Sequence, residues 1–227
     1  MRADFESKIP PHQKLARTKG IPHIGAGAIY PIPDDDITCA PFPIPKEWPR
    51  AAGGDVSKTN NAFVWGAWDR DRDILFIYSD YKRADLDVDQ NALAYKRQGD
   101  WIPLVADAAD IRSDEDRRRY IDIMRDDHNI DVEFPDKAVE TGLEQVWQRM
   151  TGGRLQIFTT CQLLMKEKAM YRRDKQGRIV KVNDHCMDSL RYLVRSGLDR
   201  AITKPSGKST LDPSPAARHI SKHGWMG

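Results

Sequence analysis

The chain has 227 residues, of which 40% are hydrophobic and 31% are charged. This length and composition suit one sizeable α/β domain with a packed core, and they exclude a chain that is disordered throughout. The formal net charge is only +2. The overall charge therefore gives no sign of a nucleic-acid partner, and any DNA-binding surface has to be a local one.

Cysteine usage and the apolar runs indicate a reducing compartment and no membrane. Cys39, Cys161 and Cys186 form no CxxC pair, and their number is odd. We therefore expect neither a disulfide framework nor a structural zinc site. No apolar run approaches the roughly 18 residues that a membrane span needs. The charged N-terminal segment also lacks the apolar stretch of a secretory signal.

The two ends of the chain differ in composition from its middle. Residues 1–49 are rich in proline and glycine, and we expect an arm or linker there, because proline fixes φ and removes a backbone donor. Residues 204–227 are rich in Ser, Pro and Lys, which predicts a mobile tail. The patterned core lies between them, over residues 50–203.

Within this core, strand-like runs alternate with helical spacings. A first strand over Arg50–Gly54 leads into Asp55, and the charged DRDRD segment predicts the turn of an antiparallel hairpin. The expected strands that follow are Ala62–Trp68, Ile74–Tyr81, Trp101–Ala106, Val132–Phe134 and Leu155–Phe158. The expected helices are Asp89–Gln98, Ser113–Asp127 with Ser113 as its cap, Val139–Met150, Gln162–Ala169 and Asp184–Ser196, the last stopped by Gly197; a second hairpin is expected over Tyr171–Val182. This order predicts an α/β fold with a mixed central sheet and helices on both faces.

Three acidic residues stand where such a fold places functional sites. Asp55 follows the first strand, and Asp107 ends the apolar run WIPLVAD. Asp188 shares a face of the last helix with Asp184, and His185 points close to the same side. Each aspartate taken alone is most often a solvated turn residue, and a lone histidine is often a surface residue. The joint pattern is harder to explain in that way, because like charges four residues apart destabilise a helix unless a cation compensates.

Clustered carboxylates are the ligands that the hard ions Mg²⁺ and Mn²⁺ prefer. Two such ions about 3.5–4 Å apart activate a water on one side of a phosphodiester and stabilise the leaving oxygen on the other. The acidic set therefore favours a two-metal site for phosphodiester hydrolysis. His185 tilts this site towards Mn²⁺ or orients the attacking water.

Basic residues near the last helix are candidate phosphate contacts. Lys181 lies just before that helix, and Arg172 and Arg173 begin the second hairpin. We take all three as candidate DNA-binding residues. A solvated hairpin is the commoner explanation for such residues, and it stays open here.

Several segments resemble, in the same order, the C-terminal part of the phage terminase large-subunit family, over roughly residues 19–195. They are GIPHIGAGAIYPI, IPKEWPRAAGGDVSKTNNAFVWGAWDRDRDILFIYSDY, WIPLVADAAD, VETGLEQVWQRMTGGRLQIF and YRRDKQGRIVKVNDHCMDSLRYLV. The last is the most specific, because the pattern K-x-N-D-H-x-x-D-x-x-R-Y on a helix is rarely found by chance.

The resemblance implies a ribonuclease H-like fold and a metal-dependent endonuclease that cuts concatemeric double-stranded viral DNA during packaging. It matches Asp55 to the first acidic ligand of the family and Asp107 to the second. It matches His185 and Asp188 to the third group, with Asp184 adjacent. The His-x-x-Asp spacing favours Asp188 over Asp184 as the third acidic ligand. The implied cofactors are two Mg²⁺ or Mn²⁺ ions.

The resemblance also implies a place in the packaging motor of a phage, in the cytoplasm of the host bacterium. The expected partners are double-stranded DNA, the terminase small subunit, the portal and the terminase ATPase domain. Because the sequence contains no phosphate-binding loop, we expect the nuclease module alone, with residues 1–49 as the linker from the ATPase domain. Two alternatives stay open: a junction resolvase or transposase-type nuclease with the same acidic set, and a non-catalytic module that docks on DNA or the portal.

Overall fold

The computed structural model describes residues 27–56, 60–85, 87–107 and 119–205, which form a single seven-stranded sheet with helices. The strand order is β1-β7-β4-β3-β2-β5-β6. β2, β3 and β4 form an antiparallel meander, β5 and β6 extend it in parallel beside β2, and β7 and β1 extend it in parallel beside β4. The strands are β1 (Thr38–Cys39), β2 (Arg50–Val56), β3 (Asn60–Asp69), β4 (Ile74–Ala84), β5 (Leu104–Asp107), β6 (Val132–Glu133) and β7 (Leu155–Phe158).

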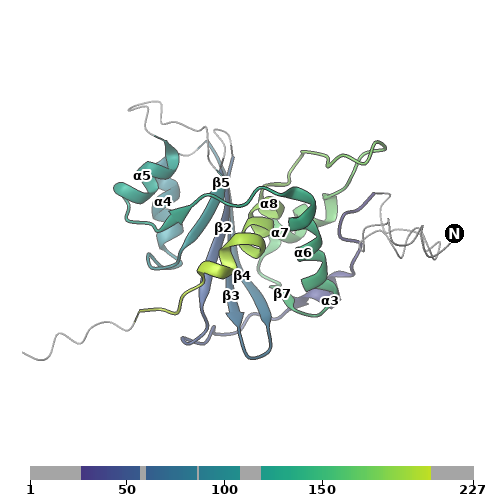
Figure 1. The fold of residues 1–227 in the computed structure, drawn as a ribbon, viewed down its shortest axis with the longest axis horizontal. Coiled ribbons are helices and arrows are strands. Elements are labelled where there is room, and N and C mark those ends of the chain that lie inside the picture. Colours follow the sequence, from purple (N-terminus) through teal and green to yellow (C-terminus); the bar gives the residue numbers. More distant parts are fainter. Residues whose placement is uncertain (1–26, 57–59, 86, 108–118, 206–227) are drawn as a thin grey trace, which may run out of the picture.

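Helices cover both faces of this sheet (Figure 1). On one face, α4 and α5 pack over Phe63 and Trp65, and on the other, α6, α7 and α8 pack over Val64 and Ile77. The helices are α3 (Asp34–Ile37), α4 (Val88–Lys96), α5 (Tyr120–Asp126), α6 (Val139–Thr151), α7 (Gln162–Met170) and α8 (His185–Tyr192). The predicted mixed sheet with helices on both faces is confirmed. In the ranges that the structure describes, no helix is long and apolar enough to cross a membrane.

Most predicted elements are present, and the differences concern their ends. The DRDRD segment is the turn between β3 and β4, and its last residue, Asp73, accepts a hydrogen bond from the indole of Trp68 (2.9 Å). α5 begins at Tyr120, and the predicted cap at Ser113 lies outside the described residues. The second hairpin is reduced to one bridge, between Arg173 and Ile179, around the turn at residues 174–177.

The prediction that Gly197 stops the last helix is wrong. A π-helical turn over Leu193–Gly197 and a 3₁₀ turn over Leu198–Arg200 continue the chain in helical conformation through this glycine. A Cβ atom at Gly197 would lie 3.0 Å from Leu193 Cδ1 and 3.6 Å from the carbonyl oxygen of Ala52. The glycine therefore leaves room for the Leu193 side chain, while β2 lies at an ordinary van der Waals distance, and its φ of −74° is an ordinary helical value.

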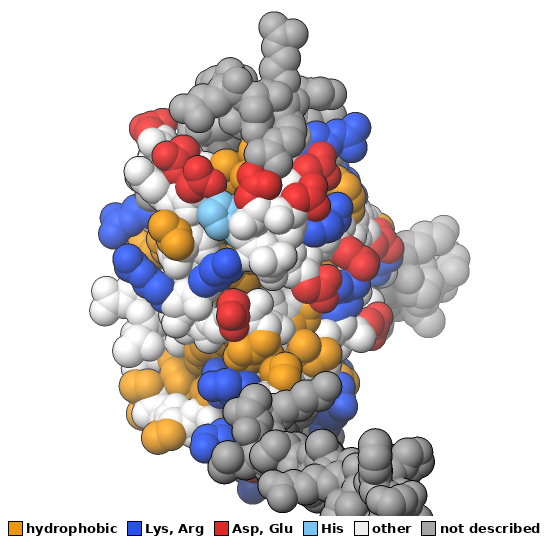
Figure 2. Space-filling view, turned by 90° about the vertical axis from the view of Figure 1, so that its left-hand side faces the viewer, with side chains coloured by type: hydrophobic (Ala, Val, Ile, Leu, Met, Phe, Trp, Pro, Cys, Tyr) orange, Lys and Arg blue, Asp and Glu red, His pale blue; other side chains and the backbone are white. Residues whose placement is uncertain are grey.

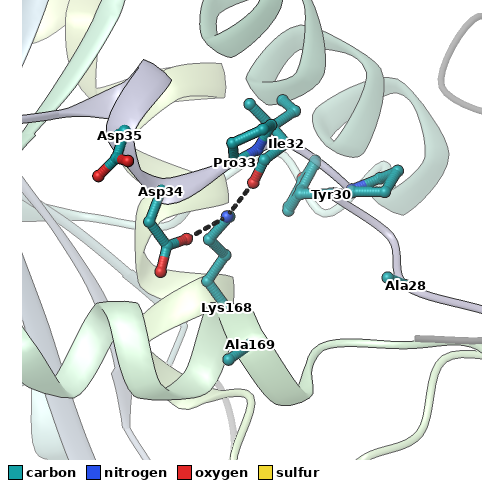
Figure 3. Close-up of a pocket in the computed structure, with 9 residues that line it drawn as sticks. Ala28, Tyr30, Ile32, Pro33, Asp34, Asp35, Lys168 and Ala169 are labelled. Carbon is teal, nitrogen blue, oxygen red and sulfur yellow. Dashed lines mark hydrogen bonds and ion pairs between the residues drawn. The ribbon is translucent and has the colours of Figure 1, made fainter. Parts of the chain in front are cut away.

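Residues 27–49, expected to be part of a linker, pack onto the domain itself. Ile29 and Ile37 are almost completely buried, and β1 pairs with β7. The ammonium of Lys168 on α7 reaches this segment and binds the carbonyl oxygen of Ile32 and the carboxylate of Asp34 (Figure 3). This part of the arm thus supplies core residues and an edge strand.

Candidate metal centre

Asp55 and Asp107 lie side by side at the ends of two parallel strands. β2 and β5 pair in parallel with Asp55 directly opposite Asp107. Paired residues of neighbouring strands point to the same face of a sheet. For Asp55 this is the face covered by α8, because a Cβ atom on Gly53, two residues earlier, would lie 2.0 Å from the carbonyl oxygen of Ser189. The structure thus brings together two of the acidic residues that the sequence singles out.

α8 runs over β2 (Figure 1), with its first residue, His185, at Asp55 and its last residue, Tyr192, at Asp107. His185, Ser189 and Tyr192 share the face of α8 that meets the sheet, since residues three and four apart lie on one side of a helix. The hydroxyl of Ser189 donates to the carbonyl oxygen of Ala62 on β3 (3.1 Å). The positive end of the helix dipole, at His185, therefore lies beside the Asp55 carboxylate.

His185 is paired with Asp55, with 2.7 Å between its Nδ1 and Oδ2 of the carboxylate. This hydrogen bond raises the pKa of His185 above its ordinary value, although partial burial opposes the shift. Burial raises the pKa of Asp55, and the hydrogen bond with His185 offsets part of that increase. His185 therefore stands beside the acidic pair, as the sequence predicts, and balances the charge of Asp55 when it is protonated.

Asp107 has two partners of its own. The ammonium of Lys137 lies 2.7 Å from its Oδ1, and the phenol of Tyr192 donates to its Oδ2 at 3.2 Å. Burial raises the pKa of the Tyr192 phenol, so the phenol keeps its proton and remains a donor at neutral pH. Tyr192 thus orients the Asp107 carboxylate from α8, while Lys137, whose side chain is 52% exposed, neutralises it from the solvent side.

Asp188 is buried and is held by two cations. Its Oδ2 lies 2.7 Å from the ammonium of Lys181, and its Oδ1 accepts from the guanidinium of Arg191 at 3.1 Å and from the phenol of Tyr171 at 3.3 Å. The same Lys181 ammonium lies 3.0 Å from Oδ2 of Asp184. Burial opposes protonation of Lys181, but the two carboxylates outweigh it and raise its pKa.

The chemistry of these donors fits a hard divalent ion, while their present arrangement is one of separate ion pairs. Asp55 and Asp107 offer carboxylate oxygens on one face, with an imidazole next to them. Among the described residues, no group of three or more His, Cys, Asp or Glu side chains is close enough together to hold a metal. Asp188, the predicted third ligand, faces Lys181 and Arg191. An ion that uses all three carboxylates would have to replace a cation of the protein.

The exposed fractions of the Lys181 and Arg191 side chains indicate which of these two cations can move away from Asp188. The side chain of Lys181 is 60% exposed, whereas that of Arg191 is 3% exposed and is fixed against Asp188. A flexible, half-exposed lysine can turn into solvent at little cost, but a buried arginine cannot, because it would leave an unpaired charge. Lys181 is therefore the cation that a metal ion would displace.

The three predicted DNA-binding residues differ in their freedom to contact phosphate. The guanidinium of Arg173 binds both carboxylate oxygens of Glu140, at 3.0 and 2.7 Å, and the carbonyl oxygen of Gly177 at 2.8 Å. Arg173 is thus occupied in holding the hairpin to α6. Arg172 is exposed, and Lys181 lies at the carboxylates. The face that carries α4 and α5 shows acidic and basic side chains intermixed rather than one basic surface (Figure 2).

Sequence reasoning missed the residues that orient and neutralise the carboxylates. Lys137 lies in the segment before α6, and nothing in its neighbourhood links it to Asp107 thirty residues earlier. Arg191 and Tyr192 belong to the last motif, as its final R-Y, but neither residue was assigned a role from the sequence. The helical spacing from His185 to Tyr192 would have placed Tyr192 on the sheet-facing side.

Comparison with known proteins gives matches to one group. The chain is 32% identical over 223 residues to a protein described as the terminase large subunit of Salmonella phage P22; the match covers 91% of this chain and 44% of that protein. The chain therefore spans less than half the length of this relative. No protein-family model matches.

Solved structures agree with this match. The nuclease domain of the P22 large terminase superposes with a TM-score of 0.69 and 26% identity, over 79% of this chain and 96% of that chain. The large terminase nuclease from the thermophilic phage G20c, solved with bound magnesium, superposes with a TM-score of 0.56 and 17% identity, over 76% and 98% of the two chains. At that identity the second likeness concerns the fold alone.

Proposed function

Since the chain belongs to the terminase large-subunit family, in the part that matches the nuclease domain, we propose that it is a divalent-metal-dependent endonuclease that cuts double-stranded viral DNA during genome packaging. The observation that carries this proposal is the pair Asp55 and Asp107, in register on parallel strands and facing α8, with Asp55 at His185 and Asp107 at Tyr192. The bound magnesium of the G20c nuclease supports the choice of ion.

In this proposal, Asp55 and Asp107 would hold one divalent ion, and Asp188, if freed from Lys181, would contribute to a second. His185 adds a nitrogen ligand or orients the attacking water. Two ions bound there would activate that water and offset the charge that develops on the scissile phosphate. Tyr192 keeps the Asp107 carboxylate directed at the site, and Arg191 keeps Asp188 in place.

Besides neutralising Asp184 and Asp188 in the absence of metal, Lys181 has a second role in this proposal, which is to bind the DNA backbone. The Lys181 ammonium, now paired with Asp184 and Asp188, would be free to contact a backbone phosphate if a bound divalent ion neutralised these carboxylates instead. Arg172, exposed on the same hairpin, extends this contact. The ATPase domain, the terminase small subunit and the portal are the partners that we propose for the chain, within a packaging motor in the host cytoplasm.

The proposal is tested by digestion of linear and supercoiled duplex DNA with Mg²⁺, with Mn²⁺ and with EDTA. We expect cutting with either ion and none with EDTA. Asp55→Asn and Asp107→Asn should abolish cutting while the protein remains folded, whereas Asp199→Asn, a matched change at an exposed position, should cut normally.

Two other outcomes would replace the proposal. A strong preference for four-way junctions over linear duplex would identify a junction resolvase. Metal-independent DNA binding without cutting under any divalent ion would identify a docking module. Cutting by Asp55→Asn at the normal rate would refute the assignment of the site itself.

A further inference from the structure

The N-terminal end of α8 is capped by a residue from another helix. Asp184, the residue that precedes α8, makes no capping hydrogen bond with its side chain. Instead, Oε2 of Glu167 on α7 accepts from the backbone N–H groups of Cys186 (2.6 Å) and Met187 (3.3 Å). The first N–H groups of a helix have no partner within it, so an acidic side chain at that position stabilises the helix start.

Glu167 is in turn fixed to the sheet by a lysine. Its Oε1 accepts from the ammonium of Lys82 on β4 at 2.7 Å, and Glu167 is 3% exposed. Lys82 pairs across the sheet with Ala62, which pairs with Asp55. Lys82 thus stands in the same row of the sheet as the two carboxylates, and Glu167 connects that row to the start of α8.

This connection acts directly beside the candidate site. His185 is the first residue of α8, and the N–H group that Glu167 binds belongs to the next residue, Cys186. A shift of this helix end would change the 2.7 Å contact between His185 and Asp55, and also the position of Asp188 one turn later.

We propose that Glu167, held by Lys82, is a positioning residue of the metal site, which fixes His185 and Asp188 relative to Asp55. This inference rests on the proposed function in so far as it concerns metal binding. Residues that orient metal ligands from behind typically change metal affinity by 10- to 100-fold when they are replaced. Glu167→Gln should be disruptive despite its similar size, because its NH₂ group would face either the Lys82 ammonium or the helix N–H groups, all of which are donors.

The experiment compares Glu167→Gln with Asp87→Asn, a matched control. Asp87 caps the start of α4, on the opposite face of the sheet, by accepting from the N–H of Gln90 at 2.8 Å. The first readout is the Nδ1 proton signal of His185 in ¹⁵N-edited NMR of the metal-free protein, which reports its hydrogen bond with Asp55. The second is Mn²⁺ affinity by calorimetry, and unfolding by urea checks that each variant is folded.

We expect Glu167→Gln to lose or broaden the His185 signal and to bind Mn²⁺ about tenfold more weakly. Asp87→Asn should lose stability without changing either readout. If Glu167→Gln does not fold, Glu167→Asp keeps the charge with a shorter reach, and it should give an intermediate weakening of both readouts. A folded Glu167→Gln or Glu167→Asp with normal values of both would overturn the proposal.

The two proposals fail in different ways. If the unchanged protein neither binds Mn²⁺ nor cuts DNA, the proposed function is lost, but the His185 signal still tests the positioning role without any metal. If metal binding and cutting are present and a folded Glu167→Gln leaves both the His185 signal and the Mn²⁺ affinity unchanged, only the positioning role is lost.

Discussion

At the scale of single residues, the carboxylates of the candidate site are balanced by cations of the protein itself. Asp107 has Lys137, Asp188 has Lys181 and Arg191, and Asp55 has His185. Carboxylates that are close together resist ionisation unless positive charge lies nearby. The side-chain cations offset this repulsion between the carboxylates, and each exposed lysine would compete with a metal ion for its carboxylate.

Replacing Lys181 with methionine should therefore strengthen the binding of Mn²⁺. An ion pair of a half-exposed lysine is worth about 1 kcal/mol, and its loss as a competitor corresponds to roughly fivefold tighter binding, since 1.4 kcal/mol is tenfold. Calorimetric titration of Mn²⁺ into the two proteins measures this. Lys175→Met, at the exposed tip of the same hairpin, is the control and should have no effect. Equal or weaker binding by Lys181→Met would show that Lys181 does not occupy the metal position.

The same variant separates the two tasks that we assign to Lys181. In an Asp55→Asn background, which should not cut, and with Mn²⁺ present to release Lys181, Lys181→Met should bind duplex DNA more weakly, and the dependence of its affinity on salt should be less steep by about one ion. Filter binding over a range of salt concentrations measures both. If the dependence of DNA affinity on salt is unchanged in Lys181→Met, Lys181 does not contact DNA, and competition with the metal is its only role.

The acidic residues, His185 and Lys181 could be predicted from the sequence, but the partner of Asp107, Lys137, and the helix cap Glu167 could not, for a physical reason. Asp55 and Asp107 each end a strand-like run, and strand ends of an α/β sheet lie together, so their proximity follows from local patterns. Lys137 and Glu167 lie in segments whose local pattern indicates only solvent or an ordinary helix. Their roles depend on how distant elements are packed, which no local pattern contains.

At the scale of elements, the position of α8 depends on small residues beneath it. Gly53 on β2 lies so close to α8 that an added Cβ would be 2.0 Å from Ser189 O and 2.8 Å from Leu193 N. These are backbone atoms, which cannot turn aside as the end of a side chain can. The glycine therefore permits the short distance between helix and sheet that brings His185 to Asp55. Two glycines, Gly53 and Gly54, precede Asp55 in the sequence, but the hydrophobic periodicity does not predict that a helix packs against Gly53.

Gly53→Ala should displace α8 and lower the free energy of unfolding by about 3 kcal/mol, the cost of overpacking a closely fitted core. Gly177→Ala is the comparison, because that glycine has a φ of +83° but no atom within 4 Å of an added Cβ. It should cost only about 1 kcal/mol, from the backbone strain. Urea unfolding of both variants measures the difference. A similar cost for both would mean that α8 adjusts freely over β2, contrary to the view that the helix is fixed there.

The predicted elements were most accurate where a local pattern and the packing agree. The Gly152-Gly153 stop of α6 and the charged turn between β3 and β4 need no tertiary information. The end of the last helix was misjudged because a glycine has two uses, as a stop and as a point of close packing. Gly197 has the second use, because the Leu193 side chain packs closely against it, and the helical path continues.

At the scale of the whole molecule, the described part of the N-terminal arm belongs to the domain. Its prolines and glycines predict irregular backbone, and from irregular backbone we expect a linker. The structure shows that such a segment can still bury apolar side chains: Ile29 and Tyr30 lie in the core with α6, and Tyr30 donates to the carbonyl oxygen of Leu143 (3.3 Å). β1 adds a strand to the sheet edge beside β7. Composition predicts regularity of the backbone better than it predicts burial.

Ile37→Ala tests whether this arm stabilises the domain. Ile37 is 0% exposed at the end of α3, so its truncation should lower the free energy of unfolding by about 3 kcal/mol through lost burial and the cavity that remains. Ile202→Ala is the matched control, because that side chain is 43% exposed and should cost less than about 0.5 kcal/mol. Urea denaturation followed by circular dichroism measures both. Two small and equal changes would restore the linker interpretation, whereas a large cost at Ile37 alone means that removing the arm weakens the nuclease fold itself.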